Sequence, residues 1–428
     1  ETHSFVMKFV LRAGAWRRRR LGFSSWKSTY DVVVVGGGAV GSSIGLQLAL
    51  HDPQLSICVI ERDPSYMRCS AILSAGGLRQ QFGLAENVAL SIYGAWWLKE
   101  GLREAVGDEA FRDPAFKENG YLTLARDGAS LRRAHETQRV AGADWIEWLP
   151  ASSLPSWLNA DGLDAATFGS RNEGYFDAHS FLSSTVAGAK RRGVTFVDGH
   201  CRAVTPHGAV LVARTGGPSS SSSSDDLLDE FSAGTAVVAS GAGSRRLVPE
   251  VPIVPRLRSI FVVHCDDEGA RPPETCPLVI DPSGCYFRAD GAPGRYVCGT
   301  APPADWPDPD VDFDAGDFDV DYSLFDDVLW PTLADRVPAF QSLKLQGAWS
   351  GLYEVNLLDH NAVVGPHPDQ PNLILAAGFS GHGLQHAPAV GRAVAELITS
   401  GTFQTIDLSP FAFDRLRSNT PLREHAIY

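Results

Sequence analysis

An apolar run at residues 30–35 leads directly into the glycine pattern Gly36-x-Gly38-x-x-Gly41, and residues 39–50 show roughly helical spacing of apolar side chains. An unbroken apolar run of this length predicts a parallel strand that is buried on both faces. Gly36 permits a tight turn, Gly38 lets a pyrophosphate approach the backbone, and Gly41 lets the helix pack closely on the strand. The pattern therefore predicts a phosphate-binding turn between a strand and a helix.

A second apolar run, residues 56–60, ends at Glu61, 20 residues after Gly41. Strand, helix and strand within about 30 residues form a βαβ unit. The helix N-terminus, at Ala39 and Val40, offers free N–H groups and a partial positive charge to an anion. The Glu61 carboxylate can accept hydrogen bonds from a ribose. Together these features predict a dinucleotide-binding domain.

Two later strands also end in glycines, at residues 235–243 and 373–379, and residues 71–78 form a loop of small side chains. A nicotinamide enzyme does not need these additional loops. An extended dinucleotide that touches the sheet at three places does need them. We therefore expect FAD as the cofactor, with Ala239 and Gly241 in contact with it.

The last of these strands continues into a loop of small residues and a predicted helix at residues 384–399. A helix N-terminus at the pyrimidine edge of a flavin stabilises the negative charge that this edge gains on reduction. The expected flavin-contacting residues of this loop are Gly378, Ser380, Gly381, His382, Gly383 and Leu384.

The rest of the chain divides into helix-rich and strand-rich parts. Residues 64–130 are predicted to be mostly helical, residues 179–192 form a further predicted helix, and residues 251–300 are predicted strands of a second sheet. The serine run Ser219–Ser224 is expected to be a loop. We therefore expect an α/β fold in which a FAD-binding domain is interleaved with an α+β domain built on a mixed or antiparallel sheet.

Composition narrows the class of protein. The net charge is −13, and a chain this acidic argues against nucleic-acid binding. There is no run of 18 apolar residues, so no transmembrane segment is expected. The seven cysteines are scattered without a Cys-x-x-Cys pair, which fits a reducing compartment and indicates no zinc site.

The N-terminal residues 1–28 contain seven basic residues and one acidic residue. A segment rich in Arg and Ser and poor in acids is typical of a mitochondrial presequence, and a basic surface arm is the alternative. We expect this segment to be a targeting or docking arm.

Several stretches resemble the D-amino-acid oxidase and sarcosine dehydrogenase superfamily over about residues 30–400. They are DVVVVGGGAVGSS, SAILSAGGL, AVVASGAGS, SGCYFRAD and GPHPDQPNLILAAGFSGHG. The resemblance implies a FAD domain of the glutathione-reductase type and a substrate domain whose sheet covers the flavin. It also implies hydride transfer from the α-carbon of an amine to flavin N5.

With this resemblance we expect the domains to alternate along the chain. The expected order is an arm at 1–28, FAD-binding segments at 29–110, 176–250 and 346–428, and substrate-domain segments at 111–175 and 251–345. Further residues expected to contact FAD are Arg62, Ser70, Ser74, Gly76, Gly77, Arg202 and Gly351.

Two departures from the superfamily affect the expected chemistry. Relatives often tether flavin covalently through a Cys near Gly351 or a His near Ser74, and this chain has neither residue there, so we expect non-covalent FAD. No basic residue matches the one that activates oxygen in oxidases. That absence favours a dehydrogenase or a protein without turnover.

Five residues form the candidate catalytic set. Arg79 matches an arginine that binds the substrate carboxylate in some relatives. Tyr286 and Arg288 alternate on a predicted strand, so they face the same way and could hold a carboxylate, although such a pair can equally lie on the surface. Tyr353 and His382 complete the set, because a histidine in the flavin loop can act as a base or orient the flavin C2 carbonyl.

Residues 305–327 contain ten aspartates. Four of them fall near ligand positions of a calcium loop: Asp310, Asp312, Asp314 and Asp321. The required glycine comes one position late, at Gly316, and no glutamate closes the loop, so we predict no metal site. A solvated acidic loop is the expectation.

Three further stretches resemble a mitochondrial branch of the superfamily that assists assembly of respiratory complex I: SAGGLRQQFGLAENVALS, WSGLYEVNLLDHNAVVGPHP and GTFQTIDLSPFAF. This resemblance implies a protein of the mitochondrial matrix, peripheral to the inner membrane, with complex I or another inner-membrane complex as partner. The alternatives are an active dehydrogenase that oxidises an amino or N-methyl-amino acid, and an oxidase.

Overall fold

The computed structural model describes residues 23–206, 208–214, 228–314 and 318–424. The serine run and most of the expected N-terminal arm lie outside these residues. Residues 23–28 of that arm belong to the first strand.

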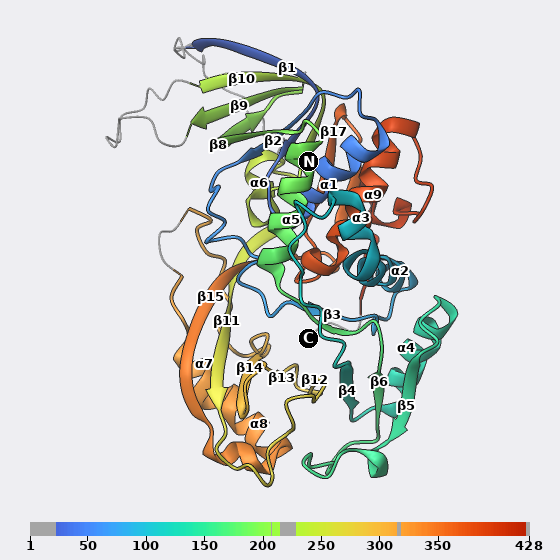
Figure 1. The fold of residues 1–428 in the computed structure, drawn as a ribbon, viewed down its shortest axis with the longest axis vertical. Coiled ribbons are helices and arrows are strands. Elements are labelled where there is room, and N and C mark those ends of the chain that lie inside the picture. Colours follow the sequence, from blue (N-terminus) through green and yellow to red (C-terminus); the bar gives the residue numbers. More distant parts are fainter. Residues whose placement is uncertain (1–22, 207, 215–227, 315–317, 425–428) are drawn as a thin grey trace, which may run out of the picture.

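The first sheet has seven strands (Figure 1). They are β1 (Phe23–Val35), β2 (Ile57–Glu61), β8 (Thr195–Val204), β9 (Ala209–Arg214), β10 (Leu228–Val238), β16 (Val363–His367) and β17 (Gln370–Ala377). Strands β8, β2, β1, β10 and β17 run parallel in that order, and β16 is an antiparallel edge. Strand β9 pairs antiparallel with both β8 and β10.

The central strand β1 is buried on both faces, as its apolar run predicts. Val32 and Val34 pack in a core with helices α1 (Ala39–His51) and α9 (Gly383–Ser400). Val33 and Val35 pack in a second core that includes Val210 and Val212 of β9. The remaining helices of the first core are α2 (Ala85–Trp96), α3 (Leu102–Val106) and α5 (Ala178–Arg191), with a π-turn η1 (Trp97–Gly101) between α2 and α3.

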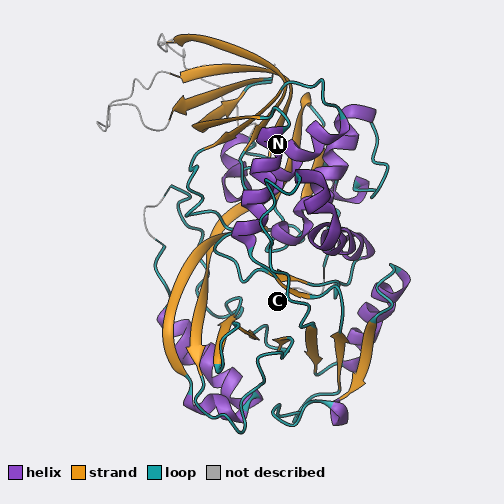
Figure 2. Cartoon of the chain, viewed as in Figure 1, coloured by secondary structure: helices purple, strands orange, loops and turns teal. Residues whose placement is uncertain are grey.

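The second sheet has eight strands, in the order β15-β11-β14-β13-β12-β4-β6-β5. They are β4 (Tyr121–Ala125), β5 (Ile146–Pro150), β6 (Ala165–Gly169), β11 (Ile253–His264), β12 (Leu278–Ile280), β13 (Tyr286–Ala289), β14 (Arg295–Gly299) and β15 (Lys344–Asn356). Strands β11 and β15 are the long curved pair along one side of this sheet (Figure 2).

Helices α4 (Gly128–Val140), α7 (Tyr322–Leu324) and α8 (Trp330–Arg336) accompany the second sheet. Its core contains Phe287, Tyr296 and Phe340, whose rings contact one another, and Phe261, whose ring contacts Phe325. The other short elements are β3 (Gly77–Leu78), β7 (Gly174–Tyr175), α6 (Ser244–Leu247), α10 (Asp414–Ser418) and the turns η2 (Ala151–Ser153), η3 (Gly241–Gly243), η4 (Phe325–Leu329), η5 (Pro338–Ser342) and η6 (Ser409–Phe411).

The α/β fold with a second, mostly antiparallel sheet confirms the expected fold class. The prediction of a mostly helical segment at residues 64–130 is wrong for its two ends. Residues 64–84 form turns and the short strand β3, and residues 107–127 form a loop and strand β4. The apolar residues of β4 are buried by pairing with β6 and β12, which local periodicity does not reveal. Among the described residues, none of the helices combines the length and apolarity needed to cross a bilayer.

Candidate functional site

A cavity of about 480 Å³ lies where the glycine-ended strands of the first sheet meet the second sheet. Its first wall is the turn after β1. Gly36 has φ +101°, and a Cβ there would meet the backbone of Ala239. A Cβ on Gly41 would overlap the carbonyl oxygen of Gly36. Helix α1 begins at Ala39 without a side-chain cap, so its first N–H groups are available to an anion.

Glu61, at the end of β2, organises this turn. Its carboxylate accepts hydrogen bonds from the backbone N–H groups of Gly37, at 2.7 Å, and Asp63, at 2.8 Å. Burial raises the pKa of the Glu61 carboxyl above its usual value, and the two N–H groups partly oppose that shift. Glu61 therefore holds the glycine loop in shape and also lines the cavity beside it.

The end of the cavity next to Glu61 is strongly basic. Arg62, Arg68, His200, Arg202 and Arg246 all line it. Phe313 lies against this group, with the Arg62 guanidinium 3.7 Å from the centre of its ring. Cationic and aromatic side chains of this kind suit the phosphates and planar base of an adenine nucleotide.

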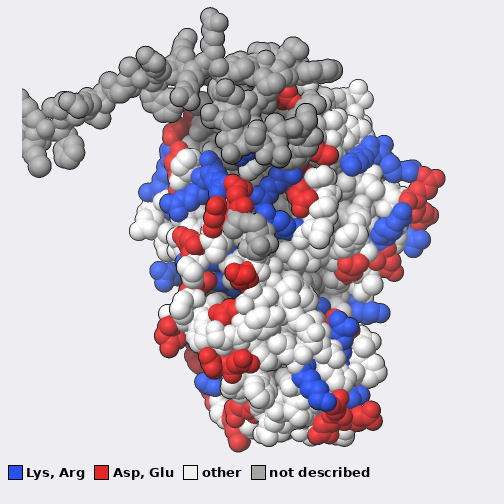
Figure 3. All heavy atoms as spheres, turned by 90° about the vertical axis from the view of Figure 1, so that its left-hand side faces the viewer, with Lys and Arg blue, Asp and Glu red and all other residues white. Residues whose placement is uncertain are grey.

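A segment that we call the acidic strap, residues 308–314, crosses beside this basic end. Asp308 contacts Arg258 at 2.8 Å and Arg256 at 2.8 Å. Asp314 pairs with Arg62 at 3.1 Å and also contacts Arg246. Basic and acidic side chains lie next to one another on the upper part of the face in Figure 3. The strap is therefore held by ion pairs and is not a freely solvated loop.

Each of the four aspartates considered for calcium contacts other groups of the protein. Asp310 and Asp312 contact Arg256 and Arg246, and Asp321 accepts hydrogen bonds from the Leu324 N–H and the Trp306 indole. Within the described ranges, no three His, Cys, Asp or Glu side chains come together as a metal site.

The loop between β17 and α9 forms another wall. Ser380 has φ +47° and Gly381 has φ +91°, so the backbone turns sharply before the helix. The Glu354 carboxylate accepts hydrogen bonds from Gly378 N–H at 2.8 Å and Phe379 N–H at 3.2 Å. Burial raises the pKa of Glu354 to about 7. The Tyr353 hydroxyl donates to the Ser380 carbonyl at 2.5 Å.

Arg79 lines the cavity next to the start of helix α9. It is 6% exposed, and its backbone N–H donates to Gln385 Oε1 of α9 at 2.8 Å. Its guanidinium contacts the Gln81 carbonyl and lies 4.0 Å from the centre of the Phe82 ring. These contacts fix the direction of a buried cation that also lines the cavity.

His382, the residue before α9, lies beside Arg79. The distance from Arg79 Nη2 to His382 Nε2 is 3.3 Å, and because a guanidinium only donates, Nε2 is the acceptor. Burial, together with the Arg79 charge, lowers the pKa of His382 well below its usual value. His382 is therefore a neutral imidazole at physiological pH.

Three tyrosines, Tyr121, Tyr286 and Tyr353, also line the cavity. Burial raises the pKa of Tyr353 to about 12 and raises the pKa values of Tyr121 and Tyr286 further. All three phenols therefore stay protonated, and the single hydroxyl proton of Tyr353 is the one donated to the Ser380 carbonyl. Leu278 and Ile280 of β12 add apolar surface.

Most of the predicted site residues line this one cavity. Those that line the cavity are Gly36, Gly38, Ala39, Val40, Glu61, Arg62, Ser70, Ser74, Gly76, Gly77, Arg79, Arg202, Ala239, Gly241, Tyr286, Gly351, Tyr353, Gly381, His382, Gly383 and Leu384.

Four predicted residues do not line the cavity. Gly41 lets helix α1 pack against the Gly36 carbonyl. Gly378 and Ser380 hold the β17–α9 loop through hydrogen bonds to Glu354 and Asn356. Arg288 faces the same way as Tyr286, as the alternation predicts, but its guanidinium stacks 4.2 Å from the Tyr175 ring centre and pairs with Asp290 at 3.1 Å. Tyr175 belongs to strand β7 and Asp290 directly follows β13, and strand periodicity predicts neither contact.

Other cavity residues were not predicted from the sequence: Tyr121, Arg246, Arg258, Phe313 and Glu354. The acidic stretch was a signal for part of this set, because its aspartates need cationic partners once they are folded against the protein. Tyr121 carried no local signal, since its strand is recognised only by its pairing.

The residues of the cavity fit FAD on structural grounds. The turn after β1 leaves no room for side chains, a helix N-terminus is uncapped, and several basic side chains and three phenols line the same cavity. Residues 31–397 match the family model described as FAD dependent oxidoreductase (DAO). The chain belongs to this family of FAD-dependent oxidoreductases, and FAD is its cofactor.

Particular relatives were also found. The chain is 38% identical over 431 residues to FAD-dependent oxidoreductase domain-containing protein 1 of Xenopus laevis, covering 93% of this chain and 84% of that protein. It resembles the crystal structure of L-proline dehydrogenase from P. horikoshii with a TM-score of 0.74 and 22% identity, covering 92% of this chain and 99% of the other. The glycine oxidase structure from Geobacillus kaustophilus has a TM-score of 0.68 and 22% identity, with 90% and 98% covered.

Proposed function

We propose that this oxidoreductase oxidises a small amino or N-alkyl-amino acid. The observation that carries this proposal is the placement of the buried Arg79 side chain in the wall of the cavity that Tyr121, Tyr286 and Tyr353 also line. A fixed guanidinium is the side chain best suited to a carboxylate. The apolar residues around it favour a small substrate and strengthen the ionic contact by excluding water.

The reaction has a simple balance. The substrate amine loses the C–H bond at its α-carbon and one N–H proton, so it gives up two electrons and becomes an imine that water hydrolyses. Bound FAD supplies the acceptor for the hydride. Arg79 would hold the carboxylate, the phenols of Tyr121 and Tyr286 would donate hydrogen bonds, and neutral His382 would leave the guanidinium as the charged member of the Arg79–His382 pair.

Non-covalent binding of FAD is part of the proposal. Ser74 and Gly351, at the positions where relatives carry a covalent link, both line the cavity. Gly351 has no side chain, and the Ser74 hydroxyl donates to the Ala71 carbonyl at 2.7 Å. Denaturation should therefore release all of the flavin into the supernatant.

The test is the absorbance spectrum of the purified holoprotein without oxygen, before and after addition of glycine, sarcosine, dimethylglycine and proline. Bleaching of the oxidised flavin by one of these compounds is the expected result. The Arg79→Met holoprotein is the control and should bleach far more slowly at the same concentration. Flavin that no amine bleaches, in a protein that chemical reductants do reduce, would overturn the proposal.

A second proposal concerns location and partner. We propose that the protein resides in the mitochondrial matrix and associates with respiratory complex I as an assembly factor or bound subunit. Support comes from residues 74–91, 349–368 and 401–413, which resemble the mitochondrial branch with that role, and from the basic composition of residues 1–28. Two of the three stretches, 74–91 and 349–368, contribute cavity residues, so assembly and chemistry would share one framework.

The test of this second proposal is native electrophoresis of mitochondrial extracts from cells that express the tagged full chain. Co-migration with complex I or its assembly intermediates is expected. Migration at the size of the free chain, with normal complex I content after the gene is removed, would contradict it. Arg79→Met should preserve co-migration if assembly does not need turnover.

A further inference from the structure

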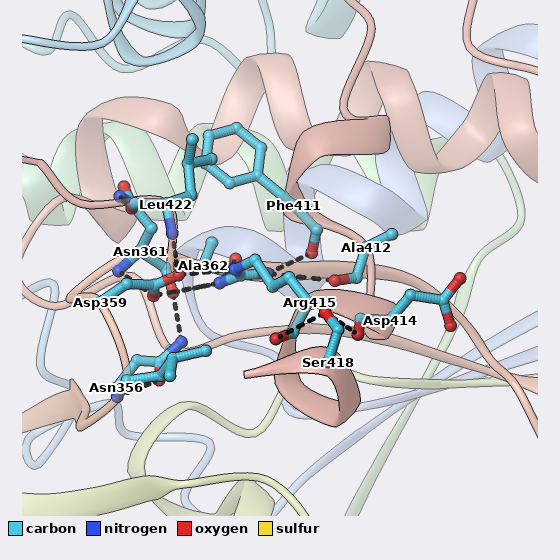
Figure 4. A network of polar contacts seen from close by, with 12 residues as sticks. Asn356, Asp359, Asn361, Ala362, Phe411, Ala412, Asp414, Arg415, Ser418 and Leu422 are labelled. Carbon is cyan, nitrogen blue, oxygen red and sulfur yellow. Dashed lines mark hydrogen bonds and ion pairs between the residues drawn. The ribbon is translucent and has the colours of Figure 1, made fainter. Parts of the chain in front are cut away.

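The C-terminal tail, residues 414–424, is fixed by a buried ion pair. Arg415 Nε lies 2.7 Å from Asp359 Oδ2, and both side chains are at most 7% exposed. The Arg415 guanidinium also donates to backbone carbonyls on two segments (Figure 4). Those carbonyls belong to Phe411, Ala412, Asn361 and Ala362. A buried cation with this many acceptors holds one position, because each lost contact would leave a polar group unsatisfied.

The backbone beyond α10 is held from both sides. Leu422 N–H donates to Asp359 Oδ2 at 3.0 Å, and Asn361 Nδ2 donates to the Leu422 carbonyl at 2.5 Å. Asn361 is joined to the flavin loop through Asn356, whose side-chain amide donates to the Asn361 carbonyl and whose N–H donates to Ser380 Oγ. The position of the tail is thus tied to the β17–α9 loop.

These contacts place the carboxylate of Glu424 at the start of helix α2. Its oxygens accept hydrogen bonds from Gly83 N–H at 2.7 Å, Leu84 N–H at 3.2 Å and Asn87 Nδ2 at 3.0 Å. Helix α2 begins at Ala85, and Leu84 provides no side-chain cap. Glu424 therefore supplies the acceptor and the negative charge that a helix N-terminus favours, from a position some 340 residues later in the chain.

The segment directly before α2 also contains Arg79. Phe82, directly before Gly83, lies 4.0 Å from the Arg79 guanidinium and packs edge-on against His382 with ring centres 4.9 Å apart. Phe82 is fully buried, so it cannot move independently of the backbone that follows it. A displacement of Gly83 would therefore be passed through Phe82 to the Arg79 guanidinium.

We propose that Glu424 is a positioning residue for Arg79, so that the C-terminal tail sets how tightly the cavity binds a small carboxylate. The inference rests on the proposed role of Arg79 in binding the substrate. Glu424 itself is not among the residues that line the cavity. It acts through the Gly83 and Leu84 N–H groups and the Phe82 ring.

The test compares two buried glutamates that each accept two backbone N–H groups, of which Glu396 also pairs with Arg392 at 2.6 Å. Glu424→Gln removes the negative charge of the carboxylate that accepts hydrogen bonds from the Gly83 and Leu84 N–H groups. The matched control is Glu396→Gln, because Glu396 on α9 also accepts two backbone N–H groups, from Gln404 and Thr405, and is fully buried. Neither Gln404 nor Thr405 lines the cavity.

The measurement is a titration of each FAD-loaded protein with methoxyacetate, a small carboxylate without an oxidisable amine, followed by the shift of the flavin absorbance. Glu424→Gln should weaken binding by about 3- to 10-fold, the range expected for coupled neighbours. Glu396→Gln should lower the melting temperature and leave binding unchanged. In an Arg79→Lys background, Glu424→Gln should weaken binding much less, because the guanidinium to be positioned is gone.

The outcomes separate this inference from the proposed function. Equal methoxyacetate affinity in folded Glu424→Gln and wild type would overturn the inference and leave the Arg79 proposal standing. A wild-type protein that binds methoxyacetate no better than Arg79→Met would overturn both. If Glu424→Gln does not fold, Glu424→Asp carries the test, because it keeps the charge and shortens its reach, and unchanged affinity there would also overturn the inference.

Discussion

Arg79 Nη2 lies 3.3 Å from Nε2 of His382, so a buried cation donates a hydrogen bond to an imidazole whose pKa burial and the Arg79 charge lower well below its usual value. This arrangement joins the segment before α2 to the first residue before α9. It keeps the imidazole neutral and leaves the guanidinium as the charged member of the pair.

Replacing Arg79 by Lys should weaken small-carboxylate binding by about 10- to 100-fold, as expected when a charged, geometrically fixed hydrogen-bond donor is lost. The measurement is the methoxyacetate titration described above. FAD content should remain normal, because the glycine turn and the Glu61 contacts that shape it do not involve Arg79. Unchanged carboxylate affinity would show that the anion binds elsewhere.

The second prediction concerns acid stability. Burial, together with the Arg79 charge, lowers the pKa of His386 to about 3, from 6.5 in the unfolded chain. The unfolded state therefore binds a proton that the folded state does not, and this contribution to stability is present above pH 6.5 and lost as the pH falls. His386→Gln, which can keep the contact to Ser91 Oγ at 3.0 Å, removes the titrating group.

Between pH 7 and pH 5 the wild type should lose about 2 kcal/mol more unfolding free energy than His386→Gln. Denaturant unfolding at both pH values measures the difference. The comparison with the variant is needed because Glu173 and Glu354, whose pKa values burial raises to about 7, contribute in the opposite direction over this range. A difference between the two proteins that does not change with pH would contradict the prediction.

The third prediction tests the turn after β1. Gly41→Ala would place a Cβ against the Gly36 carbonyl and force the turn open, at a cost of about 1–3 kcal/mol, so FAD should bind roughly 10- to 100-fold more weakly. Flavin absorbance relative to protein absorbance after dialysis reports the loss. Gly347→Ala is the control, since no atom lies within 4 Å of its added Cβ. Full flavin content in Gly41→Ala would mean that the turn relaxes without cost.

The fourth prediction concerns the acidic strap. Asp314→Asn removes ion pairs to Arg62 and Arg246, and these partly exposed pairs are each worth about 1 kcal/mol or less. FAD release should therefore become about 2- to 5-fold faster at low salt. The difference should shrink at high salt, because screening weakens the same pairs in the wild type. Asp305→Asn, an exposed change in the same stretch, should release FAD at the wild-type rate.

The first sheet and its glycine turn could be predicted because their signals are local. The apolar run, Gly36 and Gly41 lie within a dozen residues, and the close contacts they permit follow from geometry. Arg288 shows the limit of this reasoning. Alternation correctly placed it on the face of Tyr286, yet the Tyr175 ring on which it stacks belongs to β7, a segment that only the fold brings against that face.

The acidic strap and Glu424 show the same limit more strongly. Aspartates are usually solvated, and only the fold brings Arg246 and Arg256 to within ion-pair distance of them. Glu424 belongs to no motif, and its partners Gly83 and Leu84 lie some 340 residues earlier in the chain. Contacts of this kind follow from topology and leave no periodic pattern.

The order of the strands has a consequence for biogenesis. The phosphate turn at Gly36 packs on the end of β10, β10 pairs with β17, and α1 packs against Gly391 of α9. A polypeptide that is still being synthesised lacks β17 and α9, so it cannot complete the cofactor site. Flavin content therefore reports whether the last strand and helix of the sheet have folded onto the first.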